Sequence, residues 1–238
     1  MRLKRALQQA AVALLLVAVR LAAAQAGPDP MTLPTPPSAA VPVGDGRFVL
    51  RVQDGRLWLQ DNHGQPLRDW PLHDARRQDG TVLAIVDAPL RRSFVVALQG
   101  LAELWEISLD PSAEPIFDGW VHDYRMGEGL ARPGYLGIRR TRLARPLVAV
   151  FFDPRVPWLV GAEPGDPGDL PLAMTAVVIH LDIRRTMARL PLPGPATQPL
   201  DGTRLWREGG QWLLRLPAGA GCTVYDTQRW LPLRQAPR

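Results

Sequence analysis

The chain has 238 residues, of which 46 % are apolar, 21 % charged and 7 % aromatic, and it contains 21 glycines, 25 prolines and one cysteine. This composition excludes an intrinsically disordered protein and a long helical bundle, and the single cysteine excludes a disulfide framework, a covalent haem attachment motif and a cysteine-rich zinc site. Most of the formal net charge of +5 lies before residue 27, so the remaining chain is nearly balanced and nucleic acid is not an expected partner.

The first 26 residues have the pattern of a secretory signal peptide. Met1–Arg5 is basic, Ala10–Val19 is an unbroken apolar run, and Ala24–Ala26 offers small residues for cleavage. The apolar run is about half as long as the ~20 residues that span a bilayer as a helix, and it ends at Arg20. We therefore expect export with cleavage near Ala26 and no stable membrane span, with a retained anchor as the alternative.

Residues 27–38 form a Pro-rich segment, which favours an extended linker over a helix or an inner strand. Residues 39–238 are then long enough for one domain.

That domain repeats one pattern of apolar runs of four to eight residues separated by Gly, Pro, Asp or Asn, which is typical of strands and turns. In three repeats the third run ends in aspartate, at Asp110, Asp182 and Asp226. Four strands per repeat, recurring at intervals of roughly 45 to 60 residues, predict an all-β, β-propeller-like domain with about four blades of four antiparallel strands. A β-sandwich of similar strand count is the alternative. The expected strands are 39–43, 48–53, 56–60 and 67–72, then 81–87, 93–99, 101–108 and 115–121, then 146–153, 157–163, 175–182 and 187–193, and finally 203–208, 211–217, 222–227 and 230–234.

An Arg-rich insertion is expected at 124–146, and it supplies the candidate binding residues. His122 ends the preceding run, where a neutral imidazole could ligate iron or donate a proton near pH 7. The guanidinium groups of the insertion suit carboxylates, which they bind bidentately. The alternatives are a strand-end histidine bonded to backbone and a solvated charged loop. The candidate residues are His122, Tyr124, Arg125, Arg139, Arg140 and Arg142.

Other polar residues are interpreted as structural. His63 lies in a turn, His73 follows a strand end, and His180 lies within an apolar run. Glu103 and Glu106 are three residues apart on one expected strand, which places them on opposite faces and argues against a paired-carboxylate site. No metal site is predicted.

The run SFVVALQGLAELWEISLDPSAEPIFDGWVHDYRMGEG, followed by PGYLGIRRTRL, FFDPRVPWLVGA and VVIHLDIRRTMARLPLPG, resembles the cytochrome d₁ haem-domain family over about Thr81–Gly194. That family includes the propeller of cytochrome cd₁ nitrite reductase and haem d₁ biogenesis proteins. The resemblance implies a β-propeller, a periplasmic location and a link to haem d₁ or denitrification. It also implies a ligand, haem d₁ or a precursor, with several carboxylates, which are groups that the arginines of the insertion are suited to bind.

The chain departs from the family at Gly194–Gln198, where the family carries a haem-facing histidine. It also has four repeats where the family resembles an eight-bladed propeller. Nitrite reductase activity is therefore not expected. We predict a non-catalytic accessory that binds a tetrapyrrole or a periplasmic denitrification protein. Two alternatives stay open: a haem d₁ maturation enzyme using His122 as acid and base, and a structural half-propeller that closes its ring as a homodimer.

Overall fold

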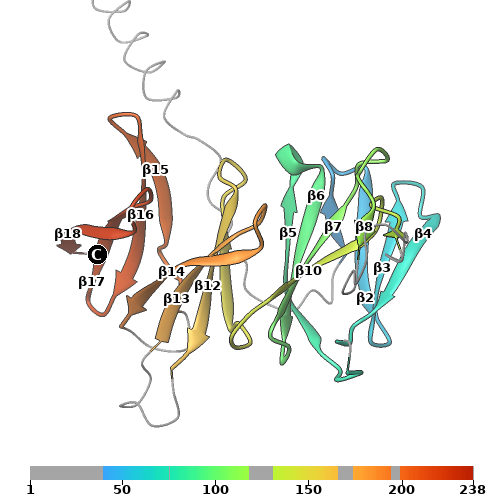
Figure 1. The fold of residues 1–238 in the computed structure, drawn as a ribbon, viewed down its shortest axis with the longest axis horizontal. Coiled ribbons are helices and arrows are strands. Elements are labelled where there is room, and N and C mark those ends of the chain that lie inside the picture. Colours follow the sequence, from blue (N-terminus) through green and yellow to red (C-terminus); the bar gives the residue numbers. More distant parts are fainter. Residues whose placement is uncertain (1–39, 75, 118–130, 166–173, 194–198, 238) are drawn as a thin grey trace, which may run out of the picture. The chain divides into compact units, whose positions relative to one another are not determined.

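The structure is a computed structural model that describes residues 40–74, 76–117, 131–165, 174–193 and 199–237. These residues all belong to one compact unit, Met31–Arg238. Their regular elements are strands, apart from the short 3-10 turn η1 (Pro89–Arg91). The strands form four antiparallel sheets of four strands each, which follow one another in chain order, and one small ribbon (Figure 1). The predicted all-β, propeller-like fold is therefore confirmed.

The first two sheets are built from the first half of the described chain. In each, the strands pair with their neighbours in sequence, except at the outer strand of the second sheet. The first sheet contains β1 (Val41–Val43), β2 (Phe48–Gln53), β3 (Arg56–Asp61) and β4 (Pro66–Pro71). The second contains β5 (Thr81–Ala88), β6 (Ser93–Gln99), β7 (Glu103–Ser108) and β10 (Ile138–Arg142).

The third and fourth sheets are simple antiparallel meanders. The third contains β11 (Ala149–Phe152), β12 (Trp158–Pro164), β13 (Met174–His180) and β14 (Arg185–Leu192). The fourth contains β15 (Arg204–Glu208), β16 (Gln211–Ala218), β17 (Gly221–Asp226) and β18 (Leu231–Pro237).

The outer strand of the second sheet lies elsewhere than the sequence predicted. Within the expected strand 115–121, only β8 (Ile116–Phe117) is described as strand, and it pairs with β9 (Ala131–Arg132). The strand that pairs with β7 is β10, from inside the expected Arg-rich insertion 124–146. The sequence IRRTR hides this strand because an edge strand with largely solvated side chains lacks the apolar signal of an inner strand.

Three apolar clusters join consecutive sheets, and alternate residues of one strand belong to different clusters. On β6, Phe94 and Val96 pack toward the first sheet, whereas Val95 and Ala97 pack toward the third. Side chains that alternate across a strand explain this division. The inner sheets thus bury both faces, which is why β6 reads as a continuous apolar run.

Large aromatic side chains lie at two of these interfaces. Trp70 of the first sheet meets Phe94 of the second edge to face, with ring centroids 6.2 Å apart. Trp158 of the third sheet meets Trp230, which immediately precedes the outer strand β18 of the fourth sheet, with ring centroids 5.1 Å apart. Aromatic pairs in this geometry add to the free energy gained from burying their surface.

Strand-ending aspartates organise several of the turns. The carboxylates of Asp61, Asp110 and Asp226 each accept a hydrogen bond from the backbone N–H two residues later, at 2.9, 3.0 and 2.7 Å. This is the geometry of an Asx turn, in which a side chain replaces a backbone acceptor. The aspartates that mark the repeats in the sequence are thus turn residues, with one exception described below.

Among the residues that the structure describes, no helix has the length and apolarity needed to cross a membrane.

The turn carboxylate of Asp226 predicts an acid-dependent loss of stability. The N–H of Gln228 lowers the pKa of Asp226, and although burial raises it, the net pKa lies below the ordinary 3.8. A carboxyl whose pKa is lowered on folding stabilises the fold above its unfolded pKa and stops doing so as the pH falls through its folded pKa. Asp226→Asn should therefore lower the free energy of unfolding near pH 6, and the difference from wild type should shrink as the pH falls below about 3.8. Urea denaturation from pH 3 to 7 measures this.

The exposed Asp201 provides the matched control, since no hydrogen bond of its carboxylate is found in the described chain. Asp201→Asn should leave the pH dependence of unfolding as it is in wild type. A stability difference for Asp226→Asn that is the same at pH 3 and pH 6 contradicts the interpretation.

Candidate functional site

The predicted site residues fall into two groups. His122, Tyr124 and Arg125 lie within 118–130, outside the described residues. Arg139, Arg140 and Arg142 lie on β10, where they pair with Glu106, Trp105 and Glu103 of β7.

The alternation of β10 sends these three arginines to two different faces of the second sheet. Arg140 and Arg142 lie on one face, whereas Arg139 lies on the other, with Glu106. Arg140 is already engaged on its own face: its Nη1 donates to Glu103 Oε2 at 2.6 Å, and its guanidinium lies 4.6 Å from the Trp105 ring centroid. The structure therefore does not bring Arg139, Arg140 and Arg142 together at one site.

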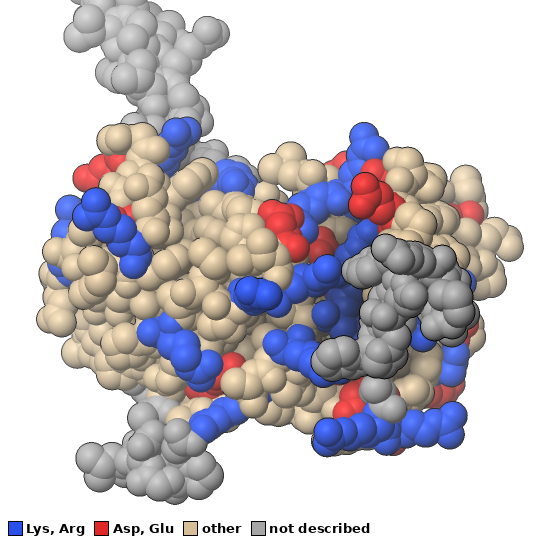
Figure 2. Space-filling view, viewed as in Figure 1, with Lys and Arg blue, Asp and Glu red and all other residues tan. Residues whose placement is uncertain are grey.

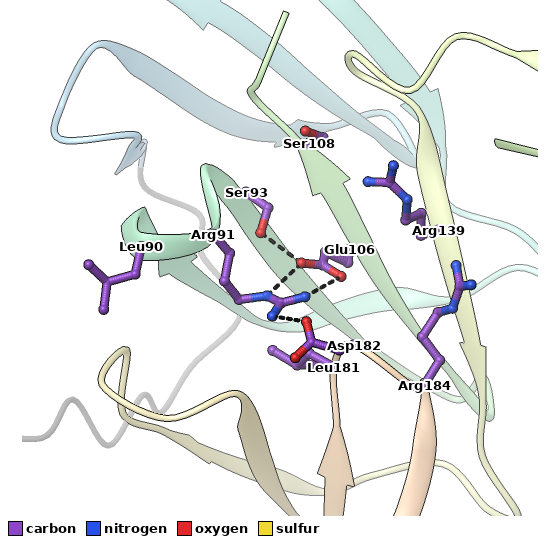
Figure 3. Close-up of a pocket in the computed structure, with 9 residues that line it drawn as sticks. All are labelled: Leu90, Arg91, Ser93, Glu106, Ser108, Arg139, Leu181, Asp182 and Arg184. Atoms are coloured by element: carbon purple, nitrogen blue, oxygen red, sulfur yellow. Dashed lines mark hydrogen bonds and ion pairs between the residues drawn. The ribbon is translucent and has the colours of Figure 1, made fainter. Parts of the chain in front are cut away.

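Arg139 lines an open cleft of about 430 Å³ between the second and third sheets. In Figure 2, basic side chains gather in the middle of the face, over the region where these two sheets meet. Since Lys4 is the only lysine of the chain, the basic groups of the described part are all arginines. The cleft is lined by Leu90, Arg91, Ser93, Glu106, Ser108, Arg139, Leu181, Asp182 and Arg184 (Figure 3).

The buried carboxylate of Glu106 is the fixed point of one wall. Glu106 is 8 % exposed, and its Oε1 accepts from Arg91 Nε and from Ser93 Oγ, both at 2.8 Å. Arg91 Nη2 also donates to Glu106 Oε2 at 3.3 Å, which completes a fork around the carboxylate. A charge this deeply buried is tolerated only when it is paired and hydrogen-bonded.

Local chain geometry sets Arg91 in this position. Pro89 begins η1, where its fixed φ suits the first turn, and Arg92 ends the turn with a left-handed φ of 47°. The chain then enters β6 at Ser93. The Arg91 side chain therefore extends from the β5–β6 connection toward the third sheet, where its Nη1 pairs with Asp182.

Asp182 and Arg184 come from the turn between β13 and β14 of the third sheet. The N–H of Leu181 donates to Pro157 O at 2.9 Å, and the N–H of Asp182 donates to His180 Nδ1 at 3.2 Å. Arg184 has a left-handed φ of 51°. These contacts fix the turn within the third sheet, and the Asp182 side chain is 55 % exposed.

Arg139 and Arg184 supply positive charge on the other side of the cleft. Arg139 Nη2 donates to Glu114 O at 3.1 Å, and Arg184 is exposed, with no ion pair found among the described residues. In Figure 3 both guanidinium groups lie away from Leu90 and make no bond to the other lining side chains. The backbone at residue 134 lies close to Glu114 O, and this requires a glycine, because a Cβ there would lie 2.0 Å from that oxygen.

The charges of the lining residues favour an anion. Three guanidinium groups face two carboxylates, and Glu106 is fully used by Arg91 and Ser93. Burial lowers the pKa of Arg91, but the hydrogen bonds and charges of Glu106 and Asp182 outweigh it and raise the net pKa above the ordinary value of a guanidinium. The cleft thus keeps permanent positive charge, and guanidinium groups bind carboxylates well.

The described histidines do not line this cleft. His63 is an exposed turn residue, His73 Nδ1 lies 2.9 Å from Asp74 O, and His180 accepts from the backbone of its own turn. Among the described residues there is also no cluster of three or more His, Cys, Asp or Glu that could hold a metal ion.

Sequence analysis missed Arg91, Glu106, Asp182 and Arg184 as site residues. It correctly placed Glu103 and Glu106 on opposite faces, since Glu103 bonds Arg140 and Glu106 bonds Arg91. The available signal was an acidic residue, Glu106, within the largely apolar run LWEIS, because a buried acid requires a partner. Nothing in the sequence indicates that the partner is Arg91.

Comparison with known proteins supports the predicted resemblance. The chain is 30 % identical over 197 residues to dihydro-heme d1 dehydrogenase of Pseudomonas aeruginosa, a match that covers 80 % of this chain and 34 % of the relative. A solved structure of dihydro-heme d1 dehydrogenase NirN in complex with DHE superposes with a TM-score of 0.59 and 27 % identity, over 82 % of this chain and 37 % of that one. Apo AztD from Citrobacter koseri gives 0.48 and 12 % identity, over 82 % and 45 %. No model of a protein family matches the chain.

The four successive antiparallel sheets define a protein of the β-propeller type. Within that class, the chain belongs with the cytochrome d₁ haem-domain proteins, as its resemblance predicted. It spans about a third of the length of the curated relative that it matches.

The contact between Arg91 and Glu106 predicts a coupled effect on stability. Glu106→Gln should lower the free energy of unfolding by about 1–3 kcal/mol, because it removes the charge that satisfies a half-buried guanidinium. In combination with Arg91→Met, the loss should fall short of the sum of the two single losses by at least about 0.5 kcal/mol. Chemical denaturation of the four proteins of this double-mutant cycle measures the coupling.

Glu103→Gln combined with Arg91→Met is the matched control, since Glu103 lies on the other face of β7. These two losses should add. Additive losses for the Glu106 cycle as well would refute the proposed link.

Proposed function

We propose that this chain is an exported cytochrome d₁-like propeller protein that binds a tetrapyrrole. The protein contacts the carboxylates of the tetrapyrrole and does not convert it into a product. It would serve as an accessory to haem d₁ metabolism or denitrification in the periplasm. The relation to a protein named dihydro-heme d1 dehydrogenase, and to a structure of that protein with DHE, supports the link to haem d₁ chemistry.

The observation that carries the proposal is the arrangement of Arg139 and Arg184 beside the Arg91–Glu106 pair. A tetrapyrrole presents ionised carboxylates at the edge of a flat apolar ring, and each guanidinium offers parallel N–H donors to such a group. The cleft volume of about 430 Å³ lies within the range of small-molecule sites, about 300–1,000 Å³. An open cleft of this size suits the carboxylate edge of a macrocycle better than enclosure of the whole ring.

The proposed role is binding without turnover. The described lining combines three guanidinium groups with two carboxylates, of which Glu106 is held by Arg91 and Ser93. A guanidinium group stays charged and binds carboxylates, and it does not serve as a proton-transfer group. Gly194–Gln198, where the family carries a haem-facing histidine, agrees with this reading at the level of sequence.

Replacing the two open guanidinium groups tests the proposal. Arg139→Gln combined with Arg184→Gln should weaken binding of coproporphyrin III, a soluble tetracarboxylate tetrapyrrole, by at least about tenfold, since two charge-assisted contacts are lost. The shift of the Soret band on titration gives the Kd. Haem d₁, purified from denitrifying cells, should show the same loss.

Arg142→Gln is the matched control, because Arg142 is an exposed arginine of the same strand on the opposite face. It should leave the Kd within about twofold of wild type. Equal affinity in the Arg139/Arg184 double variant, or no binding by the wild-type protein, counts against the proposal.

The similarity to a dihydro-heme d1 dehydrogenase favours a second candidate function, that of a haem d₁ maturation enzyme. In this candidate function, His122 acts as acid and base. His122→Ala should then abolish conversion of dihydro-haem d₁ by a preparation in which the wild-type protein is active. Conversion that is unchanged in His122→Ala excludes this role, and an inactive wild-type protein leaves the binding function as the proposal.

Export with cleavage near Ala26, a periplasmic denitrification protein as partner, and closure of the propeller by a second copy stay predictions alongside these two functions.

A further inference from the structure

Arg91 uses its donors on two carboxylates of very different exposure. The edge formed by Nε and Nη2 holds Glu106, whose side chain is 9 % exposed, whereas Nη1 pairs with Asp182, whose side chain is 55 % exposed. Figure 3 shows Glu106 and Asp182 on different sides of one guanidinium group. Glu106 therefore positions Arg91 from within the sheet, and Asp182 meets it from the surface.

Asp182 departs from the other strand-ending aspartates of the repeats. Asp110 and Asp226 use their carboxylates to hold the backbone of their own turns. In the turn after β13, the Asp182 carboxylate instead reaches Arg91 of the neighbouring sheet, and its backbone N–H donates to His180 Nδ1. Within the described chain, no backbone N–H is found to depend on this carboxylate, so it can leave Arg91 without undoing its turn.

Asp182 also lines the same cleft as Arg139 and Arg184. The Asp182 carboxylate thus occupies, at Arg91 Nη1, the position that a ligand carboxylate would take. A half-exposed ion pair contributes little to stability, because water screens it and holding the side chain costs entropy. A ligand carboxylate that also meets Arg139 and Arg184 can therefore displace it.

We propose that Asp182 is an internal competitor: it occupies Arg91 Nη1 until a ligand carboxylate displaces it. This inference rests on the proposed function and names the ligand class as compounds with at least two carboxylates, one for Arg91 and one for the Arg139–Arg184 side. Glu106 stays in place throughout and keeps Arg91 oriented. The displaced Asp182 turns to solvent. Ligand binding therefore breaks the direct contact between Arg91 of the second sheet and the β13–β14 turn of the third.

Removing the competitor should strengthen binding. Asp182→Asn should lower the Kd for coproporphyrin III by about 5- to 10-fold, since the ligand no longer competes with a charge and no longer meets its repulsion. Asp182→Ala should do the same. Asp110→Asn, a strand-ending aspartate outside the cleft that pairs with Arg92, is the matched control and should leave the Kd unchanged. Thermal unfolding of each variant verifies that it is folded.

A double-mutant cycle separates displacement from a general change of charge. In an Arg91→Met background, Asp182→Asn should improve the Kd by less than twofold, because the donor for which Asp182 competes is gone. Coproporphyrin III tetramethyl ester, delivered in detergent, should bind wild type and Asp182→Asn equally, because it has no carboxylate to compete.

The outcomes distinguish this inference from the proposed function. Coproporphyrin III binding that needs Arg139 and Arg184 but is equal in wild type and Asp182→Asn overturns the competitor and leaves the function standing. Weaker binding by Asp182→Asn, or a gain that persists in the Arg91→Met background, also overturns it. Absence of binding in wild type and in every variant overturns the proposed function itself.

Discussion

Face-to-face packing of successive sheets is the constraint on which the rest of this structure depends. A four-stranded sheet exposes two faces, and the inner sheets here bury both, one against each neighbour. This is why β6 is buried along nearly its whole length, whereas β2 of the first sheet is buried only in part. The apolar clusters fix the sheets against one another, and polar groups at their rims are thereby brought together from distant parts of the chain.

The Arg91–Glu106 pair is one result of this packing. Glu106 lies on the face of β7 that turns toward the third sheet, where burial would be costly without a partner. Arg91 supplies that partner from the β5–β6 connection and, with Asp182, extends the contact across 91 residues of sequence to the next sheet. The same group therefore satisfies a buried charge and supplies part of the lining of the cleft. Under the proposed function, the one Arg91 side chain would serve both stability and ligand recognition.

Sequence patterns located most strands of the described chain, because inner strands are recognisable in the sequence as apolar runs between turn residues. They failed at β10, whose sequence IRRTR contains three arginines and only one apolar residue, Ile138. That failure mattered for the site. Once β10 is known to be a strand, period-two alternation separates Arg139 from Arg140 and Arg142, but a loop has no such period. The sequence-based grouping of these arginines was therefore not reproduced on one surface.

The sequence by itself determined the all-β repeat, the turn aspartates and the resemblance to cytochrome d₁ haem-domain proteins, because each depends on the order of residues along the chain. The sequence indicated only that Glu106 does not form a paired-carboxylate site with Glu103. Only the tertiary structure decided that Glu106 is the buried partner of Arg91. It alone also decided that Asp182 serves a neighbouring sheet and not its own turn. These contacts arise where separate sheets meet, and the packing that joins them leaves no local signature in either segment.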